Sequence, residues 1–207
     1  MAKLYFKFGA MGSSKTAQAL MTKFNYEEKG KKVWLIKPAV DDRDNFTEQD
    51  GRVRTVVRSR IGLFQDAEAV GRDFDILSEL DRRQAEQPGY TDVIICDECQ
   101  FLTEKQVNEM KDIADMRDIP VLCFGLRADF LTKMFSGSKR LFEIADSITE
   151  IKSVCRCGRK ATVNARFDDS GNIVTEGEQI FIGGNGRYEG LCYRCYRGLV
   201  ENKNNTK

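Results

Sequence analysis

Short, almost continuously apolar runs alternate with longer polar segments over the first 150 residues of the chain. Four of these runs are predicted as strands, at residues 3–8, 33–36, 92–96 and 120–124. Thr16–Glu28 follows the first run after a glycine-containing turn, and its helix-forming residues carry apolar side chains near helical spacing. Strands that alternate with helices and are apolar on both faces predict an α/β fold, in which helices cover a parallel sheet.

The polar segments between these runs differ in their patterns. Residues 41–54 are charged and lack periodicity, which predicts a mobile loop. Residues 65–83 and 103–116 carry apolar side chains near helical spacing, which predicts two amphipathic helices.

The composition changes after about Ile151. From there on the chain contains paired cysteines, a glycine cluster and short strand-like stretches at residues 161–167 and 179–182. We therefore expect three parts, namely an α/β domain of residues 1–150, a small metal-stapled domain of residues 151–200 and a flexible polar tail of residues 201–207.

The overall composition narrows the choice of partners. The 33 basic and 32 acidic side chains leave a net charge of +1, so we expect neither nucleic acid nor an anionic membrane as a partner. No apolar run approaches the roughly 20 residues that span a bilayer, and the first residues pass directly into a predicted strand, so we expect a cytoplasmic protein. The chain contains no histidine, so any general base must be a carboxylate, lysine, tyrosine or thiolate.

Four of the seven cysteines form two close pairs, Cys155-x-Cys157 and Cys192-x2-Cys195. In a reducing compartment such pairs hold a metal more often than they form disulfides. Because the segment between the pairs is able to form a β-ribbon, the four thiols predict a closed, structural zinc site. Unrelated free thiols are the alternative, since C-x-C is less common than C-x2-C. The other three cysteines lie in or beside apolar strands and are predicted as core residues.

The turn after the first predicted strand matches a phosphate-binding P-loop. It reads Gly9, Ala10, Met11, Gly12, Ser13, Ser14, Lys15 and Thr16 and lies between a strand and a helix, as the pattern requires. In such a loop backbone amides surround the phosphates, Lys15 reaches the β- and γ-phosphates, and Thr16 ligates magnesium. Ser14 stands where the pattern usually has glycine, which adds a Cβ atom close to the phosphates. An ordinary Gly/Ser turn is the alternative.

Asp97 and Glu98 directly follow the predicted strand at residues 92–96. Both carboxylates therefore lie at the carboxyl end of a parallel strand, where open α/β sheets bind their ligands. Asp97 is predicted to share the magnesium ion with Thr16. Glu98 points the other way and is predicted to take a proton from a hydroxyl group or to orient a water molecule. A solvated acidic pair is the alternative.

Several independent segments resemble the type II thymidine kinases, and the resemblance extends over nearly the entire chain. GAMGSSKT resembles the P-loop of that family, DECQF its Asp-Glu-x-Gln-Phe signature, GLRADF its Gly-Leu-x-x-x-Phe segment, and IGGNGRYEGLCYRCY its lasso loop and second cysteine pair. The resemblance implies a RecA-like P-loop domain joined to a zinc-containing lid. It also implies that ATP, with Mg²⁺, donates its γ-phosphoryl group to the 5′-hydroxyl of thymidine or deoxyuridine, giving dTMP for nucleotide salvage.

The same resemblance assigns roles to individual residues. Glu98 matches the general base of the family, Asp41 and Arg43 match an Asp-x-Arg element near the phosphates, and Gln100 is expected near the phosphates of ATP, as is Asp97. The implied nucleoside site comprises Met11, Phe101, Leu126, Phe130, Gln179, Ile180, Phe181, Ile182, Gly183 and Tyr188. Backbone groups of residues 179–183 are expected to match the polar edge of thymine and to exclude cytosine.

The resemblance further implies a homotetramer and feedback binding of dTTP. Two other functions compete with the kinase. The first is a P-loop ATPase acting on nucleic acid, in which Asp97 and Glu98 activate water and the basic cysteine region is a zinc ribbon. The second is a non-catalytic nucleotide-binding module, in which Ser14 marks a degenerate loop.

Overall fold

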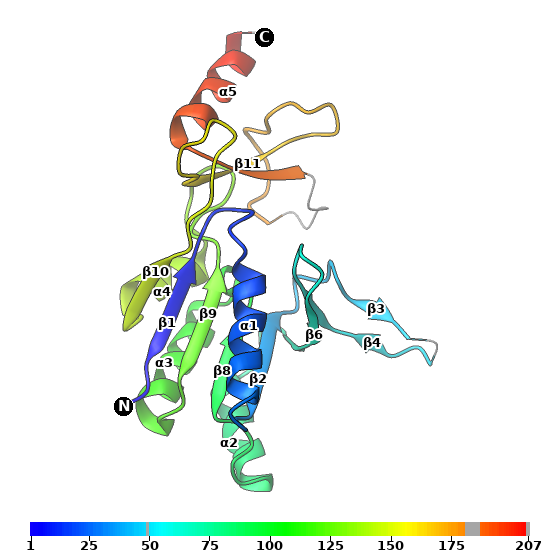
Figure 1. Cartoon of the computed structure of the whole chain (residues 1–207), viewed down its shortest axis with the longest axis vertical. Coiled ribbons are helices and arrows are strands. Elements are labelled where there is room, and N and C mark those ends of the chain that lie inside the picture. Colours follow the sequence, from blue (N-terminus) through cyan, green and yellow to red (C-terminus); the bar gives the residue numbers. More distant parts are fainter. Residues whose placement is uncertain (49, 181–186, 206–207) are drawn as a thin grey trace.

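The computed structural model describes residues 1–48, 50–180 and 187–205, which form a layered α/β domain and a smaller domain beyond it (Figure 1). The α/β domain is built on a six-stranded sheet with the strand order β10-β1-β9-β8-β2-β7, and every neighbouring pair is parallel. These strands are β1 (Leu4–Phe8), β2 (Val33–Pro38), β7 (Glu68–Val70), β8 (Val93–Cys96), β9 (Val121–Gly125) and β10 (Ser147–Glu150). The predicted parallel sheet is confirmed, with β7 and β10 added at its two edges.

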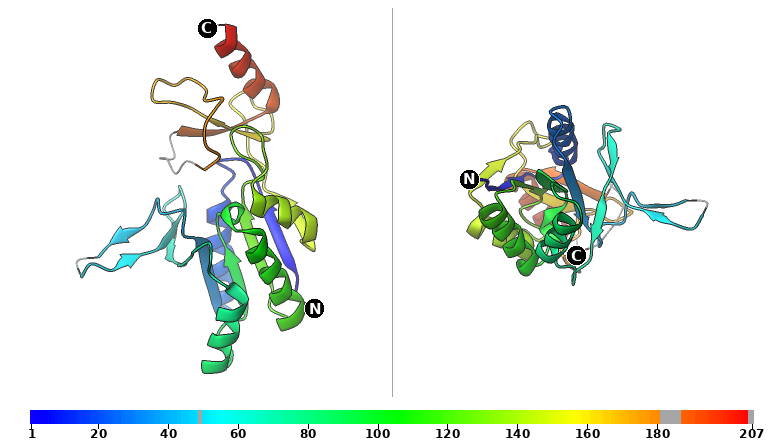
Figure 2. Two further views of the ribbon diagram at one scale, coloured as in Figure 1. Left: turned by 180° about the vertical axis from the view of Figure 1, so that it is seen from behind. Right: turned by 90° about the horizontal axis from the view of Figure 1, so that it is seen from below.

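Helices cover both faces of this sheet, as Figure 2 shows. They are α1 (Lys15–Glu27), α2 (Ile76–Glu86), α3 (Glu104–Arg117) and α4 (Ser136–Ile144), with a short 3₁₀ helix, η1 (Cys99–Phe101). Leu80, Val107 and Leu141, from α2, α3 and α4, belong to the core on one face. On the other face Leu20 of α1 packs in a second core with Leu35 and Leu122.

Local sequence explains where these elements lie. Ile94 and Ile95 of β8 are both fully buried, and because successive strand residues point to opposite faces, each belongs to a different core. The side chain of Asp75 accepts a hydrogen bond from the Ser78 amide and starts α2. Thr103 and Gln106 form a capping box that starts α3.

Two antiparallel hairpins project from one edge of the sheet. They are β3 (Phe46–Thr47) with β4 (Val53–Arg54), and β5 (Val56–Arg58) with β6 (Phe64–Asp66). The loop predicted at residues 41–54 therefore contains a short hairpin. The helix predicted over residues 65–83 is wrong in its first half, because β6 and β7 bond to neighbouring strands there and α2 begins only at Ile76.

The smaller domain consists of an antiparallel ribbon and the C-terminal helix. The ribbon pairs β11 (Val163–Arg166) with β12 (Tyr188–Leu191), and α5 spans Tyr193–Asn205. Ala161, Ala165 and Ile173 contribute to a compact core of its own. Because α5 continues to Asn205, the tail predicted from residue 201 begins inside this helix.

The structure also bears on the strand-like stretch at residues 179–182 and on membrane-spanning helices. Of the strand-like stretch at residues 179–182, residues 179 and 180 are not in a strand, and residues 181 and 182 lie outside the described residues. Within the described parts of the chain, no helix combines the length and the apolar character that crossing a bilayer requires.

Candidate active site and metal centre

The predicted P-loop joins β1 to α1 and encloses the side chain of Lys15. Lys15 is 8% exposed, and its Nζ atom donates hydrogen bonds to the carbonyl oxygens of Gly9 (3.3 Å) and Ala10 (3.0 Å). Burial lowers the pKa of Lys15 because the charged form loses hydration. An anion bound in this loop would supply the negative charge that stabilises the buried ammonium group.

Ser14 keeps the backbone conformation that glycine adopts easily. Its φ is 59°, in the left-handed region, and Gly12 in the same loop has a φ of 75°. A non-glycine residue pays about 1–2 kcal/mol for this conformation. The backbone of the loop therefore keeps the left-handed turn at Ser14. Replacing the usual glycine by serine adds local strain but does not change the path of the backbone.

Asp97 is buried beside the start of α1. Its side chain is hydrogen-bonded to Thr16, which makes the pair that the sequence predicts for a divalent cation. Burial, and then the neighbouring charge of Glu98, raise the pKa of Asp97 to about 7. Its Oδ1 atom is buried and has no hydrogen-bond partner among the described residues. An unpaired buried carboxylate oxygen is costly, so it fits a site for a hard cation such as Mg²⁺.

Glu98 stands at the end of a chain of charged and polar groups. It adopts a left-handed backbone with φ 51°. Its carboxylate accepts hydrogen bonds from Nη2 of Arg43 (2.7 Å) and Nε2 of Gln100 (2.6 Å). Behind Arg43 lies Asp41, which is 3% exposed and accepts from Nε of Arg43. Lys37, which the sequence analysis missed, lies 3.2 Å from Asp41 through its fully buried Nζ atom.

These bonded groups fix the orientation of the Glu98 carboxylate from two sides. Arg43, which is itself held by Asp41, donates to one oxygen, and Gln100 donates to the other. Gln100 is itself fixed, because its Oε1 atom accepts from the Leu126 amide at 2.9 Å. The hydrogen bonds to Arg43, together with the nearby Lys37, hold the pKa of the Asp41 carboxyl below its usual value despite burial.

Two cavities meet at these groups. Counting space that is open to solvent, the first holds about 500 Å³ and the second about 650 Å³. The first cavity is lined by Met11, Arg43, Glu98, Gln100, Phe101, Leu126, Asp129, Phe130, Phe135, Asn164, Gln179, Ile180 and Tyr188. The second is lined by Met11, Gly12, Ser13, Ser14, Lys15, Thr16, Ala17, Arg43, Asp44, Arg58, Ser59, Arg60, Ile61 and Glu98. Met11, Arg43 and Glu98 line both, so the two cavities share a wall at the predicted general base.

The structure brings most of the predicted site residues together. Seven residues of the implied nucleoside site line the first cavity: Met11, Phe101, Leu126, Phe130, Gln179, Ile180 and Tyr188. Three others, Phe181, Ile182 and Gly183, lie outside the described residues. Gln100, which is expected near the phosphates, lines the first cavity and not the second, and its side chain donates a hydrogen bond to Glu98.

Three residues of the first cavity were missed by the sequence analysis: Asp129, Phe135 and Asn164. Asp129 accepts a hydrogen bond from the side chain of Gln179 at 2.9 Å, and the Phe135 ring packs edge-on against Phe101. Asp129 lies within the GLRADF segment, so a signal was present, whereas Phe135 and Asn164 belong to no motif.

Asn164 joins the smaller domain to the P-loop. This residue of β11 is 5% exposed, its Oδ1 atom accepts from the Met11 amide (2.8 Å), and its Nδ2 atom donates to the Ala128 carbonyl (2.7 Å). Its partner across the ribbon is Gly190, where an added Cβ atom would lie only 2.6 Å from the Met11 carbonyl oxygen. The ribbon therefore contacts the backbone of Met11 through its amide and its carbonyl.

The smaller domain also contacts Phe130 in the first cavity. The guanidinium carbon of Arg166 lies 3.7 Å from the centre of the Phe130 ring, a cation–π contact. The same guanidinium donates to the backbone carbonyls of Glu176 and Glu178. The Tyr196 hydroxyl of α5 donates to the Phe130 carbonyl at 2.9 Å. One wall of the first cavity is thus held by the smaller domain.

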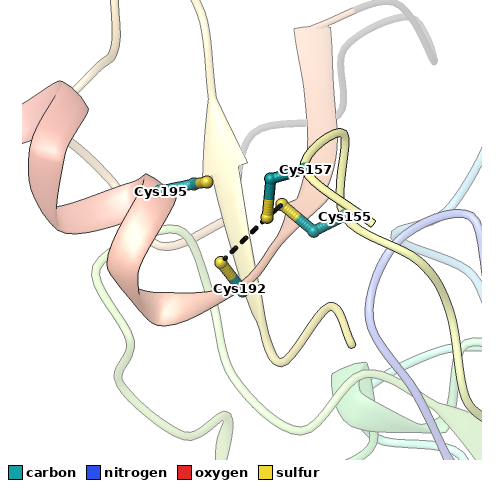
Figure 3. A group of neighbouring side chains, drawn as sticks. All are labelled: Cys155, Cys157, Cys192 and Cys195. Carbon is teal, nitrogen blue, oxygen red and sulfur yellow. Dashed lines mark hydrogen bonds between the residues drawn. The ribbon is translucent and has the colours of Figure 1, made fainter. Parts of the chain in front are cut away.

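The two predicted cysteine pairs converge in one cluster (Figure 3). Cys155 and Cys157 lie on a tight turn, whereas Cys192 and Cys195 lie at the start of α5, and all four Sγ atoms are within 4.8 Å of one another. The Cys157 sulfur is 3.6 Å from the sulfurs of both Cys155 and Cys192. Four thiolates at about 2.3 Å from a tetrahedral zinc ion stand about 3.8 Å apart, so the cluster fits such an ion closely.

Comparison with known proteins gives consistent matches. A family model described as thymidine kinase matches residues 2–196. A thymidine kinase of Photobacterium profundum is 40% identical over 95% of this chain and 97% of its own length. A thymidine kinase of Novosphingobium aromaticivorans is 44% identical over 94% of this chain and 96% of its own length, and one of Agrobacterium fabrum is 42% identical over 94% and 95%.

Similarity to solved structures is weaker. A DNA replication initiation factor has a TM-score of 0.37 at 11% identity over 72% of this chain and 40% of its own. The Pif1 helicase of Candida albicans has a TM-score of 0.40 at 14% identity over 75% of this chain and 37% of its own. Similarity at this level says nothing about function.

Proposed function

The chain belongs to the thymidine kinase family, and from that premise we propose that it transfers the γ-phosphoryl group of ATP to the 5′-hydroxyl of thymidine, with Glu98 as the general base. One observation carries the proposal. Glu98, Arg43 and Met11 line both cavities, so a nucleoside in the first and a triphosphate in the second would meet at these residues. Phosphoryl transfer needs such a junction, because the attacking oxygen and the γ-phosphorus must lie in line.

In the proposed reaction Glu98 accepts the proton of the 5′-hydroxyl group while the oxygen of that group forms a bond to the γ-phosphorus. The bond between that phosphorus and the β–γ bridging oxygen breaks, and ADP leaves. Arg43, 2.7 Å from Glu98, is placed to stabilise the negative charge that spreads over the transferring oxygens. Lys15 and the amides of the P-loop hold the other phosphates.

The first cavity accounts for recognition of the nucleoside. Phe101 and Phe130 supply aromatic walls for a planar base, and Tyr188 lies in the same cavity. Polar groups at Gln179 and Asp129 lie beside these rings. We propose that this wall, with the backbone of residues 179–183, matches the carbonyl and imide edge of thymine or uracil, which leaves cytosine with unpaired polar groups and makes deoxycytidine a poor substrate.

Two metal ions complete the proposal. Thr16 and Asp97 would hold Mg²⁺, which neutralises charge on the β- and γ-phosphates, and the unpaired Oδ1 atom of Asp97 supports this site. The sulfurs of the cluster in Figure 3 would hold Zn²⁺. A closed site of four thiolates leaves no position for substrate, so this ion would stabilise the smaller domain without taking part in the chemistry.

We also propose a homotetramer in the cytoplasm that binds dTTP as a feedback ligand. The shared wall of the two cavities supports the last point, since one molecule of dTTP would place its base in the first cavity and its triphosphate in the second. Exposed apolar side chains on α1, Met21 and Phe24, support a contact between subunits.

A phosphate-transfer assay tests the function directly. The purified protein is incubated with Mg²⁺, γ-labelled ATP and, separately, each of the four deoxynucleosides, deoxyuridine and single-stranded DNA. Label is expected on thymidine and deoxyuridine alone. Release of free phosphate that is accelerated by DNA, with no nucleoside labelled, would instead identify a nucleic-acid-dependent ATPase.

A further inference from the structure

The tip of the β5–β6 hairpin forms a closed, internally bonded turn, which we call the tip loop (residues 59–62). The Ser59 amide donates to the Leu63 carbonyl (2.7 Å), the Leu63 amide donates to the Ser59 hydroxyl oxygen (3.0 Å), and the Gly62 amide donates to the Ser59 carbonyl (3.1 Å). Gly62 has a φ of 89°, which a glycine adopts without strain. These hydrogen bonds between the loop and the adjacent Leu63 give the tip loop a defined shape.

The base of the hairpin is anchored in the core. Val56 and Val57 are 1% and 2% exposed, and Val57 packs in the core that contains Leu20 of α1. The Val56 carbonyl accepts a hydrogen bond from the buried Nζ atom of Lys37 at 3.1 Å. Because Lys37 also contacts Asp41, the same buried cation ties the hairpin to the chain of groups that ends at Glu98.

The tip loop faces the P-loop across the second cavity. Arg58, Ser59, Arg60 and Ile61 line this cavity opposite the turn between β1 and α1, and Figure 1 shows the hairpin rising beside the start of α1. No motif of the sequence analysis pointed to this wall. The tip loop therefore forms a wall of the second cavity that the P-loop does not form.

Arg60 differs from its neighbour Arg58 in its partners. Arg58 lies 3.6 Å from Asp44 and stacks over the Phe64 ring. Arg60, in contrast, is exposed and has no hydrogen bond or ion pair within residues 1–48, 50–180 and 187–205. Its charge is close enough to Lys15 to lower the pKa of that lysine. Arg60 and Lys15 line the same cavity, and two cations around one cavity favour a polyanion between them.

We propose that the tip loop is the second half of the phosphate-donor site, in which Arg60 binds the triphosphate from the side opposite the P-loop and Ile61 covers the nucleotide beyond its phosphates. This inference rests on the proposed function, because it takes the second cavity to be the donor site. Ile61 lines the second cavity and is 70% exposed in the protein alone, so its apolar surface is accessible to a ligand in that cavity. The ligand class is a nucleoside triphosphate.

Replacement of Arg60 by glutamine tests the proposal by steady-state kinetics. We expect Arg60→Gln to raise the KM for ATP by about tenfold, as loss of one charge-assisted contact to phosphate implies. The KM for thymidine should change by less than about twofold, because Arg60 does not line the first cavity. Arg52→Gln is the matched control, since Arg52 is an exposed arginine of the same edge that lines neither cavity.

Equilibrium binding provides a second readout. The wild-type protein should lose affinity from ATP to ADP to AMP, and Arg60→Gln should flatten that series while the binding of adenosine stays the same. Ile61→Ser should weaken the binding of ATP and adenosine alike. An unchanged KM for ATP, or an equal rise of both KM values, overturns the proposal. If instead the wild-type protein transfers no phosphate to thymidine, the proposed function fails, while the binding series still decides the role of Arg60.

Discussion

The α/β domain and the smaller domain are held together by different means. In the α/β domain, two large cores sandwich a parallel sheet whose central strands are completely buried. The smaller domain has one small core, which includes two of the four clustered thiols. A domain with so little apolar surface to bury typically requires a metal to fold. Under the proposed function, the larger domain would bind the phosphates, whereas residues of both domains, including the one that we expect to depend on a metal, would bind the nucleoside.

The largest expected effect concerns the chemistry of the α/β domain alone. Glu98→Gln should lower kcat by more than about a hundredfold, because glutamine cannot accept the proton of the 5′-hydroxyl group. Binding of ATP should persist, since the amide oxygen still accepts a hydrogen bond from Arg43. Glu28→Gln, at the distant end of α1, is the control. A loss smaller than about tenfold would remove Glu98 from the role of general base.

Removal of the metal should affect the smaller domain first. Cys192→Ser should abolish the bound zinc and raise the KM for thymidine by about tenfold or more, while the KM for ATP changes less. Elemental analysis of the wild-type protein should find one zinc ion per chain. Cys123→Ala is the control, because that thiol lies in the core of the α/β domain. Wild-type protein that contains no zinc would contradict the role of the cluster.

The contact between the two domains is tested at Asn164. Asn164→Leu keeps the volume of the side chain but leaves the Met11 amide and the Ala128 carbonyl without partners. A buried unpaired group costs about 1–3 kcal/mol, so both KM values should rise by about five- to tenfold. Asn108→Leu, on the exposed part of α3, should leave both unchanged. A rise of the KM for thymidine alone would show that Asn164 acts only on the first cavity and does not position the P-loop.

The smallest effect is expected at Arg166. Arg166→Lys keeps the positive charge but loses the planar contact with the Phe130 ring and one of the two bonds to residues 176–178. The KM for thymidine should rise by about threefold, with kcat and the KM for ATP unaltered. Kinetics over a range of thymidine concentrations measure this change. A fall in kcat would mean that Arg166 acts on the reacting groups and not on the wall of the cavity.

Much of this site could be predicted because its residues lie in continuous motifs. The P-loop and the Asp97-Glu98 pair follow strands that are apolar on both faces, and the cysteines are spaced as ligand pairs. Parallel strands bring such motifs to one edge of the sheet, so their proximity follows from the pattern. Sequence reasoning fails where a contact joins distant segments without a motif. Asn164 looks like an ordinary polar strand residue, and its partner Met11 lies 153 positions away.

The two hairpins were missed for a different reason. Their strands are short and largely exposed at the edge of the sheet, so they lack the apolar pattern that identifies the central strands. Residues 65–70 were included in the helix predicted over residues 65–83, yet their backbone groups bond to neighbouring strands. Because the tip loop and Arg60 belong to the β5–β6 hairpin, the sequence pattern did not predict them either.

Gly190 has a consequence for how the two substrates are spaced. A single methyl group at this position would have to share space with the carbonyl oxygen of Met11, so any side chain there acts as a spacer that lifts the ribbon from the phosphate loop. Misplacement of reacting groups by about 1 Å is enough to slow a reaction about a hundredfold. If the two cavities bind the two substrates as proposed, the distance between the substrates would therefore depend on Gly190, a residue that lines neither cavity.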